Sequence, residues 1–145
     1  MFRAKRHPQP VIQMRLIKPA LVYFILIFAT GFALAMIRIP FLVPRLGVRW
    51  AELVELPFIL LASFLVARWL VQRFGLVTVR QCIGTGLLAL LMMLSAELAV
   101  TLFQGQDLGD YLAGRDPVSG MAYLASLLLF AAMPLLVRKQ AVSRA

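Results

Sequence analysis

The stretch ALVYFILIFATGFALAMI at residues 20–37 decides the fold of this chain. Its 18 residues carry no charge, and as a helix they measure about 27 Å, close to the roughly 30 Å of hydrocarbon in a bilayer. Lys18 precedes the run and Arg38 follows it, so the run predicts a helix that crosses a membrane. A cleavable secretory signal fits less well, because signal cores have about 7 to 15 residues and further apolar runs follow.

Three more apolar runs lie downstream, and the four predicted spans cover about residues 20–39, 50–74, 81–104 and 117–137. Hydrophobic residues make up 62% of the 145 residues and the mean hydropathy is +0.90, against roughly 45 to 50% apolar residues in soluble domains. We therefore predict an all-α protein, a transmembrane four-helix bundle. Its membrane domain is residues 19–138, between a basic tail at 1–18 and a second tail at 139–145, with no room for a separate catalytic domain.

Local signals mark where the predicted helices end. Gly75 is placed to close the second span in a left-handed cap, and Asp116 followed by Pro117 is a strong start signal for the fourth. Residues 107–112 have apolar residues at helical spacing, which predicts a short helix on the membrane surface. Small residues in the third span predict close helix contact: Gly84, Gly86, Ala89, Ser95, Ala96 and Ala99.

The distribution of positive charge predicts the topology. The net charge is +9, and eleven of the fifteen lysines and arginines lie in or near the two tails and the connection between the second and third spans. With four spans these segments share one side, so the positive-inside rule predicts that both termini are cytoplasmic. Because the basic residues beside the spans already have this topological role, we expect the tails to contact anionic lipid head groups rather than nucleic acid. Trp50 and Trp69, about 28 Å apart on a helix, are predicted interface anchors.

All six carboxylates fall on the opposite side, and arginines accompany them there. Glu52, Glu55 and Glu97 are predicted at the membrane edge, near Arg38, Arg45 and Arg49, and three aspartates lie in the last loop: Asp107, Asp110 and Asp116. Glu52 and Glu55 are three residues apart and share a helix face, which we expect to turn toward Glu97 and Arg38. Two interpretations remain open. The cluster is either a structural ion-pair network or a binding or proton-handling site with a raised carboxylate pKa.

Metal and covalent chemistry have little support in the sequence. The only histidine, His7, lies in the first tail, and the only cysteine is Cys82. Di-iron bundles need Glu-x-x-His pairs, and a serine hydrolase needs a histidine beside its serine. We therefore predict no metal site and no cofactor.

The segments GFALAMIRI at residues 31–39, VPRLG at 43–47 and AELVELP at 51–57 resemble small, mostly uncharacterised, four-span bacterial membrane proteins. The resemblance implies a multi-pass protein of the bacterial inner (plasma) membrane and groups Arg38, Arg45, Glu52 and Glu55 in one motif, without implying an activity. Small multidrug exporters are similar in size, but their essential glutamate lies in the first span, and the first span of this chain has no glutamate. Glutathione-handling membrane enzymes share an Arg-to-Glu motif at the second span, but its His and Asn are absent here.

The expected function is that of an accessory or assembly subunit of a larger membrane complex. Four short helices leave little interior for a substrate path, while small residues and methionines suit docking against other membrane subunits or copies of the chain itself. The alternative is a small oligomeric transporter or proton-coupled carrier in which Glu55 or Glu97 titrates. A small membrane enzyme is the third possibility.

Overall fold

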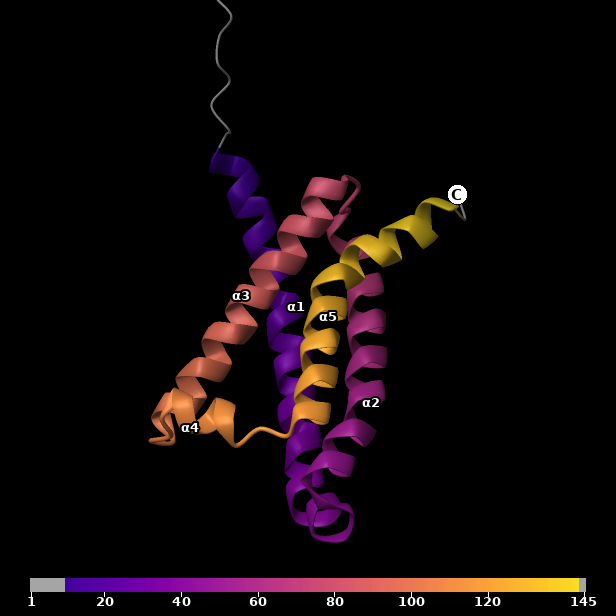
Figure 1. The fold of residues 1–145 in the computed structure, drawn as a ribbon. Coiled ribbons are helices and arrows are strands. Elements are labelled where there is room, and N and C mark those ends of the chain that lie inside the picture. The colour runs from indigo at the N-terminus through magenta and orange to yellow at the C-terminus, as the bar shows by residue number, and fades with distance from the viewer. Residues whose placement is uncertain (1–9, 144–145) are drawn as a thin grey trace, which may run out of the picture.

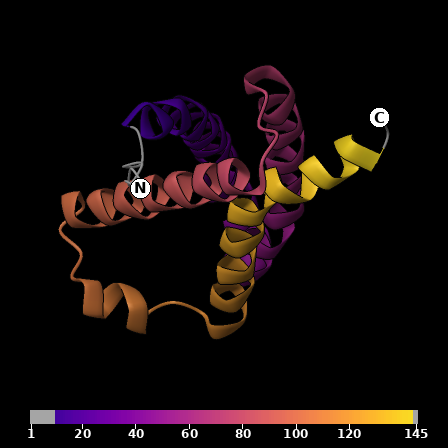
Figure 2. The same cartoon turned by 90° about the horizontal axis from the view of Figure 1, so that it is seen from above.

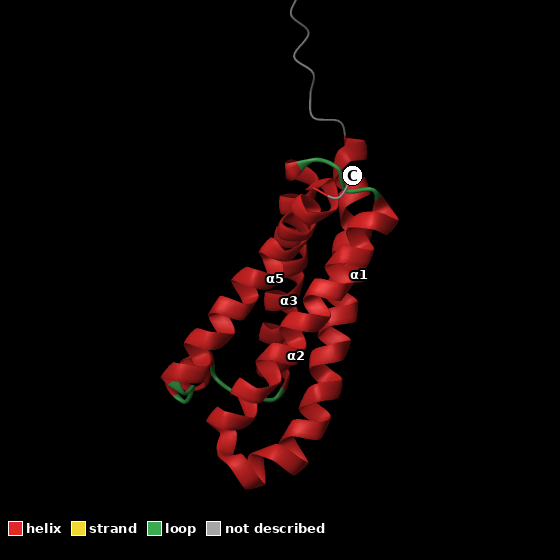
Figure 3. Cartoon of the chain, turned by 90° about the vertical axis from the view of Figure 1, so that its right-hand side faces the viewer, coloured by secondary structure: helices red, strands yellow, loops and turns green. Residues whose placement is uncertain are grey.

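A computed structural model describes the backbone of residues 10–143 and the side chains of residues 15–139. In this part of the chain, helices are joined by short connections (Figure 3). No strand occurs in this part of the chain. The elements are α1 (Pro10–Ile37), the π-helical turn η1 (Arg38–Leu42), α2 (Val43–Phe74), α3 (Val79–Phe103), the short α4 (Leu108–Ala113) and α5 (Pro117–Ser143). The prediction of an all-α protein is confirmed.

The long helices run up and down between two ends of the molecule (Figure 1). One end, which we call the basic end, holds the start of α1, the α2–α3 connection and the end of α5. The other, the acidic end, holds the turn between α1 and α2 and the connection that carries α4. This up-and-down order separates the charges, because every carboxylate of the chain lies at or near the acidic end.

Three helical segments of the described chain are long and apolar enough to cross a membrane: Arg15–Phe74, Val79–Phe103 and Pro117–Lys139. The first has 60 residues and contains both α1 and α2. Large apolar side chains on the outside of these helices are more than half exposed, among them Phe58, Leu65 and Leu128. Helices that are apolar all round are expected in lipid, so the chain is a membrane-embedded, multi-pass protein by its composition.

The helix ends follow the local signals. Gly75 has φ 61° and ψ 47°, which confirms the predicted left-handed cap of α2, and Thr78 opens α3 with a capping box. The predicted cap of α5 is also confirmed, since Asp116 Oδ2 accepts a hydrogen bond from the Ser119 backbone N–H at 3.0 Å. α1 differs, because its helix already starts at Pro10, inside the segment expected to be a tail. Apolar residues among positions 11–17 continue the helical pattern across Pro19.

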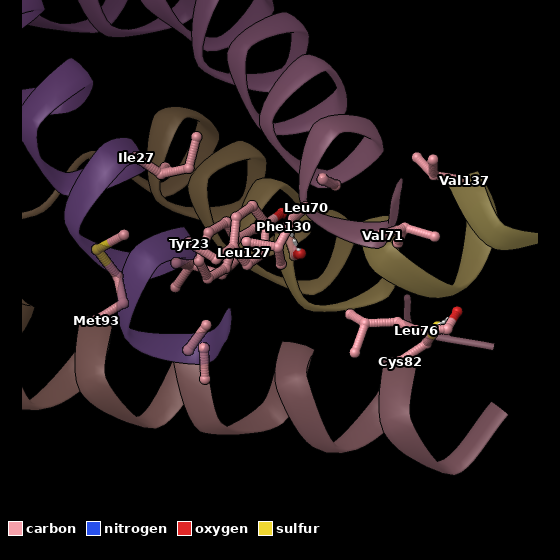
Figure 4. Close-up of a cluster of buried hydrophobic side chains, with 13 residues drawn as sticks. Tyr23, Ile27, Leu70, Val71, Leu76, Cys82, Met93, Leu127, Phe130 and Val137 are labelled. Atoms are coloured by element: carbon pink, nitrogen blue, oxygen red, sulfur yellow. Dashed lines mark hydrogen bonds between the residues drawn. The ribbon is translucent and has the colours of Figure 1, made fainter. Parts of the chain in front are cut away.

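The helices pack most tightly in the half of the bundle nearer the basic end. A Cβ added to Gly86 of α3 would lie 1.9 Å from the backbone oxygen of Ala131 on α5, so the two backbones cross in contact. Tyr23 of α1 stacks on Phe130 of α5, with ring centroids 4.4 Å apart, and its hydroxyl donates to the Phe130 carbonyl oxygen at 2.7 Å. Figure 4 shows Leu127 and Leu70 gathered around these two rings.

From this crossing α3 diverges from α5 toward α4 (Figures 1 and 2). The close approach requires a residue without a side chain, and Gly86 supplies it only near the start of α3. Toward the acidic end the α4 connection bridges the separated helix ends. The α3–α5 pair is therefore closed near the start of α3 and splayed toward the acidic end.

Candidate functional site: a charged groove at the acidic end

The splayed helices enclose a groove of about 1010 Å³. We call it the acidic groove, because all six carboxylates of the chain line it. Its walls come from α1, α2, α3 and α5, with residues of the α4 connection at its rim. Apolar side chains form the walls, chiefly Phe28, Phe32, Leu56, Ile59, Met93, Leu127 and Phe130. The groove is thus apolar along its walls and charged near the acidic end.

Arg38 is the counter-ion of two glutamates. Its Nε lies 3.1 Å from Glu55 Oε2 and its Nη1 lies 3.8 Å from Glu52 Oε1. The side chains are only 15 to 26% exposed, so little water screens their charges. Neither Arg38 Nε nor Glu55 Oε2 has a hydrogen-bond partner, because the two groups are close but not aligned for a hydrogen bond. Their attraction is therefore mainly electrostatic.

A second ion pair joins α2 to the start of α5. Arg49 donates to Asp116 Oδ1 from Nη2 at 2.5 Å and from Nε at 2.9 Å. The hydrogen bonds from Arg49 and from the Ser119 backbone lower the pKa of Asp116 to about 2, since they stabilise its charged form. The same carboxylate therefore caps α5 and holds the tip of the α1–α2 hairpin.

Glu97 of α3 meets an aromatic and arginine group instead of a salt bridge. The hydroxyl of Tyr123 on α5 donates to Glu97 Oε1. The guanidinium of Arg115 lies 4.2 Å from the centre of the Tyr123 ring, and its Nη1 donates to the Tyr111 hydroxyl at 2.5 Å. No lysine or arginine forms a salt bridge with Glu97 in the part of the chain that the structure describes.

The groove concentrates buried polar atoms that lack hydrogen-bond partners. Such atoms are rare in folded proteins, because each costs about 1 to 3 kcal/mol. Six of them occur among the described side chains, and four belong to residues that line the acidic groove: Arg38 Nε, Glu55 Oε2, Arg115 Nε and Ser119 Oγ. Arg38 Nε and Glu55 Oε2 face each other in their ion pair, so Arg115 Nε and Ser119 Oγ are the groove atoms left without any partner among the described residues.

The structure brings together some of the residues singled out from the sequence and separates others. Arg38 joins the three glutamates in the acidic groove. Arg45 is exposed and has no ion pair among the described residues, while Arg49 pairs with Asp116 rather than with a glutamate. The cause is Gly47, which lies between the two arginines and breaks α2 with φ 79°. Both predicted anchors are exposed on α2 and lie outside the groove: Trp50 and Trp69.

Sequence reasoning missed three groove residues, Arg115, Ser119 and Tyr123. Two spacings carry the signal. Tyr111 and Arg115 are four residues apart across the end of α4, and Ser119 and Tyr123 are four apart on one face of α5, directly after Asp116. The face of α5 that follows Asp116 is the one that lines the groove.

A tight metal site has no geometric support in residues 15–139, where no three His, Cys, Asp or Glu side chains are close enough to hold an ion. No family model, curated protein or solved structure matches the chain. The resemblance of residues 31–57 to four-span bacterial membrane proteins therefore stays a prediction, and the function has to be argued from the groove itself.

Proposed function

We propose that the chain spans a bacterial inner membrane four times, with both termini in the cytoplasm. The 60-residue segment would cross twice, because α1 and α2 run in opposite directions on either side of the turn at η1. The basic end would face the cytoplasm, where seven described lysines and arginines meet anionic lipid: Arg15, Lys18, Arg68, Arg73, Arg80, Arg138 and Lys139.

Labelling with a membrane-impermeant thiol reagent tests this topology in a Cys82→Ser background. Gly109→Cys in α4 should react in intact cells with a permeable outer envelope. Val77→Cys, in the α2–α3 connection, should react only after the inner membrane is opened. Both positions are exposed, so access to the reagent decides the result. The reverse pattern would overturn the proposed orientation.

We further propose that the protein is a small carrier that binds an amphipathic molecule in the acidic groove. The observation that supports this best is the combination of apolar walls with a charged end in one groove of about 1010 Å³. Ligand sites have volumes of about 300 to 1,000 Å³ and are mostly apolar, with a few polar groups that orient the ligand. The expectation that four short helices leave little interior for a substrate path is weakened by a groove of this volume.

An accessory or assembly subunit is the second candidate. The acidic groove also favours it, because a helix of a partner subunit could occupy this volume in place of a small molecule. The structure weakens one argument for this role, namely that small residues of α3 suit docking against a partner. The small residues Gly86 and Ala89 are buried within the bundle and are not available for docking.

Photo-crosslinking from inside the groove separates the two candidates. A photoreactive amino acid at Ile59 lies on the groove wall, and one at Leu61 on the exposed side of α2 serves as the matched control. After irradiation of native membranes, the carrier role predicts an adduct of small-molecule mass at Ile59 that is absent at Leu61. A protein adduct specific to Ile59 would favour the accessory role, and identical lipid adducts at both positions would overturn the binding proposal.

A further inference from the structure

We infer that the ligand of the acidic groove is an organic cation with an apolar body, and that Glu97 is its counter-ion. The inference rests on the proposed binding function and names the chemical class of the ligand. It is carried by the juxtaposition, in one groove, of a carboxylate without a salt bridge, a buried hydroxyl without a partner and an apolar wall.

The first step concerns the balance of charge. The groove is lined by six carboxylates but by only two guanidinium groups, those of Arg38 and Arg115. Arg38 already pairs with two glutamates, and Asp116 pairs with Arg49. The carboxylates of Glu97, Asp107 and Asp110 form no salt bridge among the described residues. An anion entering the groove would meet this negative field, whereas a cation would be attracted to it.

The second step singles out Glu97 among these three. Asp107 and Asp110 are exposed at the rim, where water solvates their charge, whereas Glu97 is partly buried on α3. A carboxylate at such depth is costly unless it is paired. Tyr123 holds one of its oxygens, which orients the group and leaves the second oxygen available to a ligand.

Arg115 lines the same groove as Glu97, but its contacts are with two tyrosines. Its guanidinium lies over the Tyr123 ring and donates to Tyr111, and it forms no salt bridge with Glu97. Arg115 thus stacks on the ring of Tyr123, the residue whose hydroxyl binds Glu97. The position beside Glu97 is left for a cation from outside the described chain.

The third step is the hydroxyl of Ser119, an independent observation that also points to a ligand. Ser119 is 1% exposed, lines the groove and has no hydrogen-bond partner for its Oγ. It lies one helical turn from Tyr123 on the same face of α5. A hydroxyl oxygen accepts hydrogen bonds, so this group can contact an ammonium N–H or the polarised hydrogens next to a quaternary nitrogen. A ligand without polar or charged groups would leave the Ser119 hydroxyl without a hydrogen-bond partner.

The apolar wall then supplies the rest of the ligand site. Phe28, Ile59, Met93 and Leu127 line the groove from four different helices, so an apolar body would be enclosed rather than laid on a surface. Aromatic faces also attract cations within about 6 Å, and Met adapts to ligands of different shape. The site is suited to an amphipathic cation that reaches it from the membrane.

Two ions of nearly equal size and opposite charge test the inference. The purified full chain in nanodiscs is dialysed against radiolabelled tetraphenylphosphonium or tetraphenylborate, with empty nanodiscs to correct for partition into lipid. We expect saturable binding of tetraphenylphosphonium and none of tetraphenylborate. Glu97→Gln should weaken that binding about tenfold or more, because it removes the negative charge that attracts the cation, and Glu97→Asp should restore part of it. Arg45→Gln, outside the groove, should leave binding unchanged.

The outcomes distinguish this inference from the function on which it rests. Binding of tetraphenylborate in preference, or binding of the cation that Glu97→Gln does not change, would overturn the inference while leaving a ligand-binding groove intact. Binding of neither ion would also overturn it, and the Ile59 crosslinking would then decide the proposed function alone. If Glu97→Gln fails to fold, the contrast between the two ions in the unmodified protein still decides.

Discussion

Tyr123 on α5 donates its phenolic hydrogen to the carboxylate of Glu97 on α3. Both residues line the acidic groove, with Glu97 toward the end of α3 and Tyr123 near the start of α5. At the other end of the same helix pair, Gly86 holds α3 against Ala131 through backbone contact. Backbone packing therefore joins α3 and α5 at Gly86, and a polar side-chain contact joins them again at Glu97, beside the acidic groove.

Tyr123→Phe should loosen the acidic end without disturbing the crossing. The variant keeps the ring under Arg115 but removes the donor to Glu97, and hydrogen bonds between membrane helices contribute about 0.6 to 1.7 kcal/mol. We expect unfolding in sodium dodecyl sulfate mixed micelles to become easier by about 1 kcal/mol. Tyr111→Phe, which removes a hydroxyl within the α4 connection, is the matched control and should have a smaller effect. Equal effects would contradict the bridging role of Tyr123.

Gly86→Ala should damage the basic end of the same helix pair. The added methyl group would lie 1.9 Å from the Ala131 backbone oxygen, so the helices must separate, and overpacking of this kind costs about 1 to 3 kcal/mol. Gly31→Ala is the control, since its methyl group would meet Ile59 at an ordinary 3.6 Å. Unfolding free energies in mixed micelles should fall for Gly86→Ala only. A Gly86→Ala protein as stable as Gly31→Ala would show that the two backbones are not in contact.

The elements of this fold were predictable because their signals are local. An uncharged run as long as residues 20–37 has few stable alternatives to a spanning helix, and glycine after a helix or aspartate before proline sets a boundary within a few residues. Gly75 and Asp116 end and start helices where the sequence placed them. The helical segment at 108–113 also follows from spacing alone.

The groove was not predictable in the same way, because it depends on how far helices diverge. The sequence places six carboxylates near one end, but the crossing at Gly86 and the break in α2 at Gly47 decide which charged groups face one another. Residues 45 and 49 would share a face on an unbroken helix. Because the chain breaks between them, Arg49 reaches Asp116 across 67 residues of sequence while Arg45 remains exposed.

The Arg49–Asp116 pair should make stability depend on acid. The pKa of Asp116 is about 2 in the folded protein, below its ordinary value of about 3.9, so the charged carboxylate stabilises the fold above pH 4. This contribution is lost as the pH falls from about 4 through 2. Asp116→Asn keeps a capping side chain but removes the charge, so it should be less stable than the parent at pH 6, with the difference vanishing near pH 2.

Unfolding midpoints measured from pH 6 to pH 2 check this dependence. Asp110→Asn, at the same end of the molecule but without an ion pair among the described residues, should follow the parent protein through the acid range. A stability difference between Asp116→Asn and the parent that stays constant from pH 6 to pH 2 would contradict the ion pair.

Arg38→Ala should destabilise the protein more than any other single loss of an arginine at the acidic end. It leaves Glu52 and Glu55 without a counter-ion. Removing one partner of a fully buried pair lowers the free energy of unfolding by about 3 to 5 kcal/mol. Because these side chains are partly exposed, we expect a loss of about 1 to 3 kcal/mol here. Arg45→Ala, on an exposed residue without an ion pair in the described chain, is the matched control.

The double variant Arg38→Ala with Glu55→Gln separates electrostatics from packing. If Arg38 serves mainly as a counter-ion, Glu55→Gln should recover part of the stability lost in Arg38→Ala, because the carboxylate left unpaired is then neutral. If the two losses simply add, the 3.1 Å approach of Arg38 to Glu55 contributes no coupling, and the arginine stabilises the turn through its aliphatic stem instead.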